Sequence, residues 1–436
     1  MKIIGPCIGD VKHNGIKFWI GIIAETADPI RETNTIEIRD SSTNGIIDSI
    51  SFKEEPLSNH QYKLYCKGWY AETNKLSANT TYKYTLKIKF QQHKLYQYES
   101  EFSSAPDPNS ASDYKILVCS CFNAKGKYSD NKQKVWKVIN EKLKGHQSIS
   151  LILGDTNYSN SECRGKKWEY TEYQYAISDF QKHVSSFPTY TIYDDHDFAG
   201  NNTYGARFDL ASKGPNEYSK REDIARYFNR LWPNPKNESR KSKEGCFYLV
   251  TYGNIEIYML DTIYYRENLS KTKKKLALLG SNEIIVGSDP SINLVNGNIQ
   301  WEWLKEKICK HPNKLKIICS GSTFGSLKKN YLEEVNALFG LLEEYPNVLL
   351  LSGDIHKLAN RKHKFNNRIY NELVSSGLGR SKKPNEVKEI LGGFLLLDVS
   401  ETKKEVSWKF YQFPEKNAEY LKMINQLPST LKLKDV

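Results

Sequence analysis

Three apolar segments of the chain each end in an aspartate, and a histidine follows closely after two of them. The segments end at Asp155, Asp195 and Asp354, with His196 directly after the second and His356 two residues after the third. A buried strand that stops at a carboxylate brings an oxygen ligand to one edge of a sheet, and carboxylates together with imidazoles bind metal ions. Three such strand ends in one domain therefore favour a metal-dependent hydrolase.

Each of these acidic positions also has a plainer explanation. A single strand-ending aspartate such as Asp155 is more often a helix cap or a turn residue. The run from Asp194 to Asp197 contains three carboxylates, which repel one another unless cations neutralise them. An exposed acidic turn is the alternative explanation of this run. Asp354 and His356 point the same way on an extended segment, but a glycine turn with a capping aspartate is the alternative. All these plainer explanations would have to hold together, which favours the metal centre.

Two other side chains would make the centre a mixed one. Cys121 ends the apolar segment 114–121, where a buried cysteine is ordinarily a small hydrophobic residue. Beside Asp155 it would instead be a thiolate ligand. A thiolate, a carboxylate and the phenolate of Tyr158 together suit ferric iron better than magnesium.

Candidate catalytic and substrate-binding residues lie in the second acidic region. His196 is expected to donate a proton or to stabilise the transition state, with Asp194 as a second catalytic residue and Asp195 on a metal ion. Asn201 and Asn202 could orient the loop or contact the substrate. The pattern suits two-metal phosphoryl hydrolysis, in which ions about 3.5–4 Å apart hold the phosphate and activate water. The chain has neither the nucleophile elbow of serine hydrolases nor a P-loop.

The elements that must position these residues fall into two parts. Residues 1–105 contain short segments rich in Tyr, Thr and Ile between turn signals, which predict an all-β sandwich. The Pro- and Ser-rich segment 103–112 marks a boundary. Residues 106–413 alternate continuous apolar segments with stretches of helical spacing, which predicts an α/β catalytic domain whose chemistry lies at the carboxyl ends of its strands. Residues 414–436 are expected to form a C-terminal helix near the entrance.

Composition narrows the class of protein. The chain has 436 residues, 39% of them hydrophobic, which is typical of a folded globular protein. No run of 18 apolar residues, signal peptide or CxxC pair occurs, so we expect a cytoplasmic protein with reduced thiols and no transmembrane segment. The net charge of +12 would attract anionic substrates, although a lysine-rich solvated surface is the more common explanation of such a charge. The sequence contains no RRM or KH motif, so we do not expect sequence-specific nucleic-acid binding. It gives no indication of the oligomeric state.

The order of the motifs resembles that of the alkaline phosphatase D-like (PhoD-like) metallophosphoesterases. In that family a strand ending Ser-Cys precedes Gly-Asp-x-x-Tyr, Asp-Asp-His-Glu and Ser-Gly-Asp-x-His. The matching segments here are Ser120-Cys121, Gly154-Asp155-Thr-Asn-Tyr158, Asp194-Asp195-His196-Asp197, Ser352-Gly-Asp354-Ile-His356, Leu260-Asp-Thr262 and Tyr265-Arg266. Asp197 stands where the family usually has Glu. The N-terminal part, with Gly5-Pro6 and Phe18-Trp19, is similar to the family's leading β-sandwich, so the resemblance covers nearly the whole chain.

The resemblance implies an α/β (α+β) fold: a calcineurin-like four-layer sandwich behind a fibronectin-like β-sandwich. It implies two metal ions, Fe(3+) and Ca(2+). The ligands would be Cys121, Asp155, Tyr158 and His356 for iron, and the bridging Asp155 with Asp195 and Asp354 for calcium. The implied activity is that of an alkaline phosphatase or phosphodiesterase, in which a metal-activated hydroxide attacks a phosphorylated small molecule, nucleotide or phospholipid and His196 assists the leaving group. The alternative is a catalytically silent binding or scaffold protein of the same fold.

Overall fold

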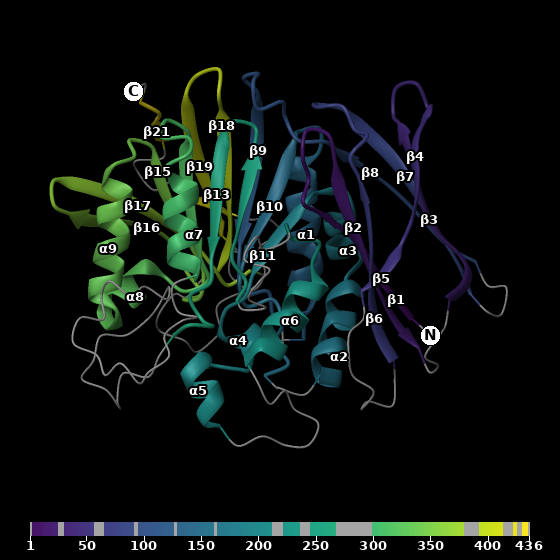
Figure 1. Ribbon diagram of the computed structural model, residues 1–436, viewed down its shortest axis with the longest axis horizontal. Helices are drawn as coiled ribbons and strands as arrows, with labels where there is room; N and C mark the ends of the chain where they lie inside the picture. The colour runs from purple at the N-terminus through teal and green to yellow at the C-terminus, as the bar shows by residue number, and fades with distance from the viewer. Residues whose placement is uncertain are drawn as a thin grey trace.

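The part of the chain that the structure describes folds into four β-sheets with helices between and outside them. The computed structural model describes residues 2–24, 30–55, 65–90, 95–125, 129–160, 164–211, 221–235, 245–266, 299–378, 392–412, 422–424 and 430–434. Two sheets come from residues before the segment 103–112 and two from residues after it. The architecture is therefore a mixed α/β fold with several sheets (Figure 1).

The two N-terminal sheets are antiparallel and four-stranded, with strand orders β1-β2-β6-β5 and β4-β3-β7-β8. Their strands are β1 (Lys2–Gly9), β2 (Ile16–Ala24), β3 (Ile30–Asp40), β4 (Ile46–Ser51), β5 (Lys53–Glu55), β6 (Tyr65–Thr73), β7 (Thr81–Phe90) and β8 (Leu95–Ser103). Successive side chains of a strand point to opposite faces, so one apolar set is buried. Phe18 of β2 meets Tyr84 of β7 and Phe102 of β8 edge to face, with ring centroids 5.1 and 5.7 Å apart. The two sheets thus share one aromatic core.

The other two sheets each contain a set of adjacent parallel strands. The seven-stranded sheet has the order β11-β10-β9-β18-β19-β20, with β21 also on β19, and the six-stranded sheet has the order β12-β13-β14-β15-β17-β16. Strands β9, β10 and β11 run parallel, and so do β13, β14, β15 and β17. The strands are β9 (Asp113–Cys119), β10 (Ser148–Leu153), β11 (Thr189–Ile192), β12 (Tyr248–Tyr252), β13 (Ile255–Leu260), β14 (Leu315–Ser320), β15 (Val348–Ser352), β16 (Leu358–Phe365), β17 (Arg368–Ser375), β18 (Gly393–Ser400), β19 (Glu405–Gln412), β20 (Lys422–Ile424) and β21 (Thr430–Lys432).

Helices lie on the outer sides of these two sheets and beyond the carboxyl ends of their parallel strands (Figure 1). They are α1 (Ser129–Leu143), α2 (Arg164–Tyr175), α3 (Ser178–Ser186), α4 (Asp195–Phe198), α5 (Gly205–Leu210), α6 (Arg221–Leu231), α7 (Ile299–Ile308), α8 (Phe324–Asn330) and α9 (Leu332–Glu343). Figure 1 shows α7, α8 and α9 beside the six-stranded sheet, and α1 and α3 between the seven-stranded sheet and the N-terminal strands. Strands β10 and β13 are buried along their whole length, as expected for strands covered on both faces.

Helix α3 joins the N-terminal sheets to the rest of the molecule. It packs against β1 and β8 on one side and against α1 on the other. The hydroxyl of Tyr84 donates to the carbonyl oxygen of Ser185 at 2.8 Å, and the hydroxyls of Tyr98 and Ser185 are 2.8 Å apart. These contacts couple the β-rich N-terminal region to the helical layer.

The C-terminal segment differs from its expectation. A helix over 414–436 is wrong for the described residues, because 422–424 and 430–432 form β20 and β21, both antiparallel to β19. The outer edge of β19 offers unpaired backbone groups, and hydrogen bonding to that edge is stronger than the tendency of so short a segment to form a helix. The other residues of 414–436, apart from 433 and 434, lie outside the described residues. Within the described ranges, no helix is both long and apolar enough to cross a membrane.

Candidate metal centre

The candidate ligands follow the carboxyl ends of neighbouring parallel strands. Cys121 comes two residues after β9 and Asp155 two residues after β10, while Asp195 comes three residues after β11. Since these three strands are parallel and adjacent, their carboxyl ends lie at one sheet edge. The end of β15, in the other sheet, is followed by Asp354 and His356. The structure therefore brings all four motifs to one place.

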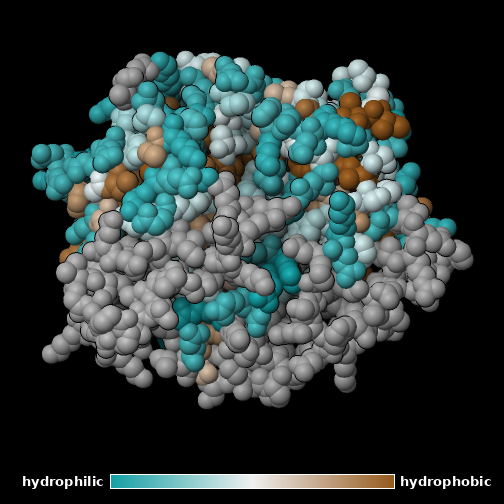
Figure 2. Space-filling model, in the orientation of Figure 1, coloured by the Kyte–Doolittle hydropathy of each residue, from teal (hydrophilic) through white to brown (hydrophobic). Residues whose placement is uncertain are grey.

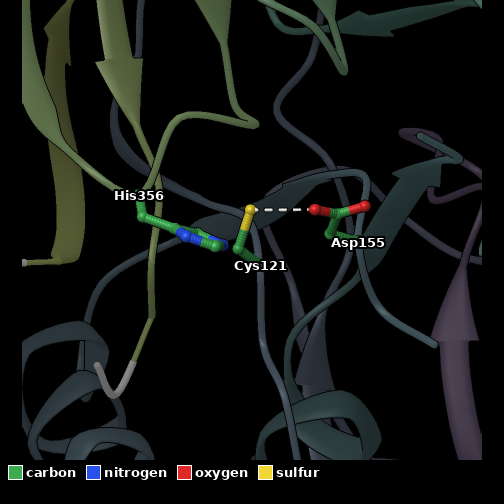
Figure 3. A group of neighbouring side chains, drawn as sticks. All are labelled: Cys121, Asp155 and His356. Carbon is green, nitrogen blue, oxygen red and sulfur yellow. Dashed lines mark hydrogen bonds between the residues drawn. The ribbon is translucent and has the colours of Figure 1, made fainter. Parts of the chain in front are cut away.

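The first group of ligands combines sulfur, oxygen and nitrogen. Figure 3 shows Cys121, Asp155 and His356 facing one another, and their ligand atoms all lie within 4.8 Å of each other. Cys121 Sγ donates to Asp155 Oδ2 at 3.2 Å. The hydroxyl of Tyr158 donates to the same oxygen at 3.1 Å and lies 3.4 Å from His356 Nε2. The thiol, phenol, carboxylate and imidazole expected from the sequence are thus adjacent.

A second group shares one member with the first. The ligand atoms of Asp155, Asp195 and His196 also lie within 4.8 Å of each other. The backbone N–H of His196 donates to Asp155 Oδ1 at 3.3 Å and to Asp195 Oδ1 at 2.8 Å. Asp155 therefore directs one oxygen toward the cysteine group and the other toward the second group, as a residue between two ions would.

Asp354 lies beside these groups without belonging to either. Its carbonyl oxygen accepts a hydrogen bond from Cys121 Sγ at 3.6 Å. Burial, followed by the negative charge of Asp195, raises the pKa of the Asp354 carboxyl to about 6. Its charge also contributes to raising the pKa of Asp194. The Asp354 carboxylate therefore interacts electrostatically with Asp195, a member of the second group.

Asp194 is held in a closely packed position between strand ends. It is 2% exposed, and its Oδ1 accepts from Ser322 Oγ at 3.0 Å. Its Oδ2 is buried and has no hydrogen-bond partner among the described residues. Gly154 has a positive φ of 80°, and a Cβ there would lie 2.6 Å from the Asp194 Cβ, so only glycine allows this approach.

The electrostatics of the centre call for cations. Burial raises the pKa of Asp155 far above its usual range, and the charges of Asp194, Asp195 and Asp197 raise it further. Burial likewise raises the pKa of the Cys121 thiol well above its usual value. Buried carboxylates that crowd together are costly unless positive charge compensates them. The donor set of thiolate, phenolate, imidazole and carboxylates fits a mixed pair of metal ions. Asp194 Oδ2, which has no hydrogen-bond partner among the described residues, adds a further buried negative charge beside it.

The backbone at the ligand positions is unusual. Cys121, Asp155, Asp354 and His356 have φ values of 59°, 56°, 71° and 51°. Residues other than glycine rarely adopt this left-handed conformation, and where they do the strain is concentrated at functional sites. Four of the proposed ligands share it, so the strand ends are bent to aim these side chains inward.

The residues around His196 orient its ring. Its Nδ1 lies 2.5 Å from Asn160 Oδ1, and its ring packs on that of Tyr158 with centroids 4.2 Å apart. Burial lowers the pKa of His196. Asn201 and Asn202 are exposed, and the backbone N–H of Asn202 donates to Asp195 Oδ2. Figure 2 shows hydrophilic residues on the surface in the region of α4 and α5, the two helices between which Asn201 and Asn202 lie in the chain.

Several residues at the centre had no role assigned to them from the sequence. Asp197 accepts hydrogen bonds from the backbone of Thr156 at 2.9 Å and of Asn157 at 2.7 Å, which fastens the loop after β10 to α4. Ser376 Oγ donates to Cys121 Sγ at 3.1 Å. Ser322 comes two residues after β14, which lies beside β15 in the six-stranded sheet. A polar residue after the end of an apolar strand was the signal that would have identified it.

The family comparison decides the class of protein. The PhoD-like phosphatase family matches residues 158–420, more than half of the chain. The chain belongs to the PhoD-like phosphatase family. This confirms the resemblance noted from the motifs, although Cys121 and Asp155 precede the matched residues. Membership in the PhoD-like phosphatases supports a phosphoester hydrolase in general.

A solved structure agrees with this assignment at the level of fold. The purple acid phosphatase PPD1 from yellow lupin (Lupinus luteus) seeds matches with a TM-score of 0.63 and 13% identity, over 94% of this chain and 72% of that one. At this identity the likeness shows the fold alone, which is calcineurin-like. GAP50 of Plasmodium also matches, with a TM-score of 0.39 and 12% identity, over 72% of this chain and 89% of that one. No curated protein sequence matches the chain. Fold and family together support a metallophosphoesterase.

Proposed function

We propose that this PhoD-like chain is a metal-dependent phosphoesterase with alkaline phosphatase or phosphodiesterase activity. The observation that carries the proposal is the position of Asp155, whose two oxygens face two separate groups of ligands. Two groups that share a carboxylate are the arrangement expected for a two-ion centre. The substrates would be phosphorylated small molecules, nucleotides or phospholipids.

Each proposed ligand has a place in this scheme. Iron, Fe(3+), would be held by Cys121, Asp155, Tyr158 and His356, and calcium, Ca(2+), by Asp155, Asp195 and Asp354. When bound, the ions supply positive charge to the phosphoryl oxygens and lower the pKa of water. The protein contributes the buried setting, which excludes bulk solvent and strengthens these interactions. Ser376 and the backbone of His196 hold Cys121 and Asp155 in position.

His196 is our candidate for protonating the leaving group. Its Nδ1 faces Asn160 and its ring packs on Tyr158, which leaves the Nε2 edge as the part able to meet a substrate oxygen. Asp194 is buried, so we assign it a role in positioning rather than in contact with the substrate. Asn201 and Asn202 are exposed beside Asp195 and would contact the substrate from the loop.

The N-terminal sheets belong to the same proposal. We assign residues 1–105 to a fibronectin-like β-sandwich domain and residues 106–413 to a four-layer catalytic domain. The boundary falls between the end of β8 at Ser103 and the start of β9 at Asp113. We propose that the protein acts in the cytoplasm. The rival function, a silent scaffold of the same fold, predicts that the ligand residues hold no ions.

One experiment separates the two functions. The purified full-length protein is analysed for bound metals, and its hydrolysis of p-nitrophenyl phosphate and bis(p-nitrophenyl) phosphate is measured before and after chelation and after addition of iron and calcium. We expect bound ions and turnover that chelation abolishes and the two metals restore. A protein that holds no metal and hydrolyses neither ester after loading would be the silent scaffold.

A further inference from the structure

The loop after β13 brings an arginine to the edge of the candidate metal centre. Arg266 Nε donates to the carbonyl oxygen of Thr262 at 2.8 Å, and its Nη2 donates to Ser322 Oγ at 2.9 Å. Ser322 Oγ in turn donates to Asp194 Oδ1 at 3.0 Å. The ring of Tyr204 lies 5.9 Å from the guanidinium carbon. The guanidinium is thus fixed by its own loop, by the residue after β14 and by the start of α5.

Ser322 connects the guanidinium of Arg266 to the carboxylate of Asp194, because its hydroxyl accepts from Arg266 and donates to Asp194. The positive charge of Arg266 therefore lies beside the acidic side chains of the centre. Among the described residues, Arg266 nevertheless forms no ion pair within 4.0 Å. Its two hydrogen bonds use the Nε–H and one N–H of Nη2, so three of its five N–H groups have no described partner. A cation beside the centre therefore still has donors to offer.

The chemistry of those donors matches one kind of ligand. A guanidinium is a planar fork of donors that pairs with two oxygens of a phosphate, and such charge-assisted hydrogen bonds are among the strongest in proteins. We propose that Arg266 binds a charged non-bridging oxygen of the substrate's phosphoryl group and that Ser322 is a positioning residue for it. This inference rests on the proposed phosphoesterase function. A phosphomonoester has one more charged oxygen than a diester, so Arg266 would favour monoesters.

Substitution tests the inference on the metal-loaded, full-length protein. Arg266→Gln should lower kcat/KM for p-nitrophenyl phosphate by roughly ten- to a hundredfold through a raised KM, the loss expected for one charge-assisted contact. The loss for bis(p-nitrophenyl) phosphate should be smaller, and inhibition by inorganic phosphate should weaken with the monoester effect. Arg266→Lys should recover part of the loss. Arg39→Gln is the matched control, because Arg39 pairs with Glu37 on β3 in the N-terminal sheets.

Chemical modification of the wild-type protein gives a second readout that needs no variant. Phenylglyoxal modifies accessible arginines, and inorganic phosphate should protect Arg266 but not Arg39 when peptides are quantified by mass spectrometry. Equal protection of both residues, or an Arg266→Gln variant with unchanged KM and phosphate inhibition, would overturn the assignment. An inactive wild-type protein would instead count against the proposed function, and the protection experiment would still report whether Arg266 binds phosphate.

Discussion

Buried carboxylates occur at both ends of the parallel strands, which form two opposite edges of the central sheets. Their negative charge is compensated differently at the two edges. Glu256, near the amino end of β13, pairs with Lys316 of β14, and both side chains are almost fully buried. Burial alone would raise the pKa of Glu256, but hydrogen bonds from Lys316 and Tyr258 outweigh it and hold the pKa below its usual value. At the carboxyl ends, Asp155 and Asp194 meet other carboxylates instead. At the edge formed by the amino ends, Lys316 supplies the compensating positive charge. At the edge formed by the carboxyl ends, bound metal ions would supply it.

The largest effect should follow from neutralising the shared carboxylate. Asp155→Asn removes one charge from both ligand groups, so it should release metal and lower kcat/KM by on the order of ten-thousandfold, about 5 kcal/mol. Activity and metal content are measured together. Asp398→Asn is the control, because Asp398 lies on β18 and pairs with Lys115. An Asp155→Asn protein with full metal content and activity would remove the contrast between the two edges.

Removing Lys316 tests whether the edge formed by the amino ends is stabilised by its own ion pair. Lys316→Met leaves Glu256 buried without its cation, so the free energy of unfolding should fall by about 3–5 kcal/mol. The metal content of the folded protein should not change. Urea unfolding measures the loss, and the double variant with Glu256→Gln should recover part of it. If Lys316→Met were instead to release metal, the two edges would not be independent.

The acidic edge should make the ion-free protein sensitive to pH. In the folded state the pKa of Asp354 is raised from 3.8 to about 6, so the folded protein binds more protons than the unfolded chain between these values. Its contribution to stability is therefore present below pH 3.8 and lost as pH rises through 6, by at most about 3 kcal/mol. Urea midpoints of chelated protein measured from pH 4 to pH 7 should show this slope. The slope should be smaller in Asp354→Asn, in which Asp155 and Asp194 still have raised pKa values, and it should be absent from metal-loaded protein.

The smallest effect should come from a carboxylate near the centre that already has its partners. Glu372 accepts from Ser352 Oγ at 2.6 Å and from the backbone of Phe324 at 2.8 Å, and lies 2.7 Å from His363 Nε2. Glu372→Gln keeps an acceptor but loses the charge, so we expect a loss of about 1–2 kcal/mol in stability and less than a tenfold loss of activity. Glu343→Gln, at an exposed position, serves as the control. A larger loss of activity than of stability would show that Glu372 acts on the centre through Ser352.

The parallel strands and their chemical endings could be predicted from sequence. Continuous apolar segments that stop at Cys121, Asp155, Asp195 and Asp354 predict buried strands, and parallel strands must place their carboxyl ends at one edge. Local sequence therefore contained most of the proposed site.

Contacts made through distant segments could not be predicted. Arg266 reaches Ser322 only because β13 and β14 are neighbours, and nothing local in either segment indicates that pairing. The burial of Asp194 depends on the glycine at 154, which lies in another motif. The C-terminal strands were missed for the same reason, since they form on the edge of β19 rather than through their own propensity.

The order of strands in the seven-stranded sheet has a consequence for synthesis of the chain. Strand β9, which carries Cys121 at its end, pairs with β10 on one side and with β18, residues 393–400, on the other. A ribosome reaches β18 almost 300 residues later. Until β18 is synthesised, one edge of the apolar strand β9 has no partner strand. For most of this period the neighbouring acidic cluster also lacks Asp354 and His356. Chains that stop before β18 should therefore associate through β9 and depend on chaperones, whereas chains that pass it can close the sheet and bind metal at nearly the same stage.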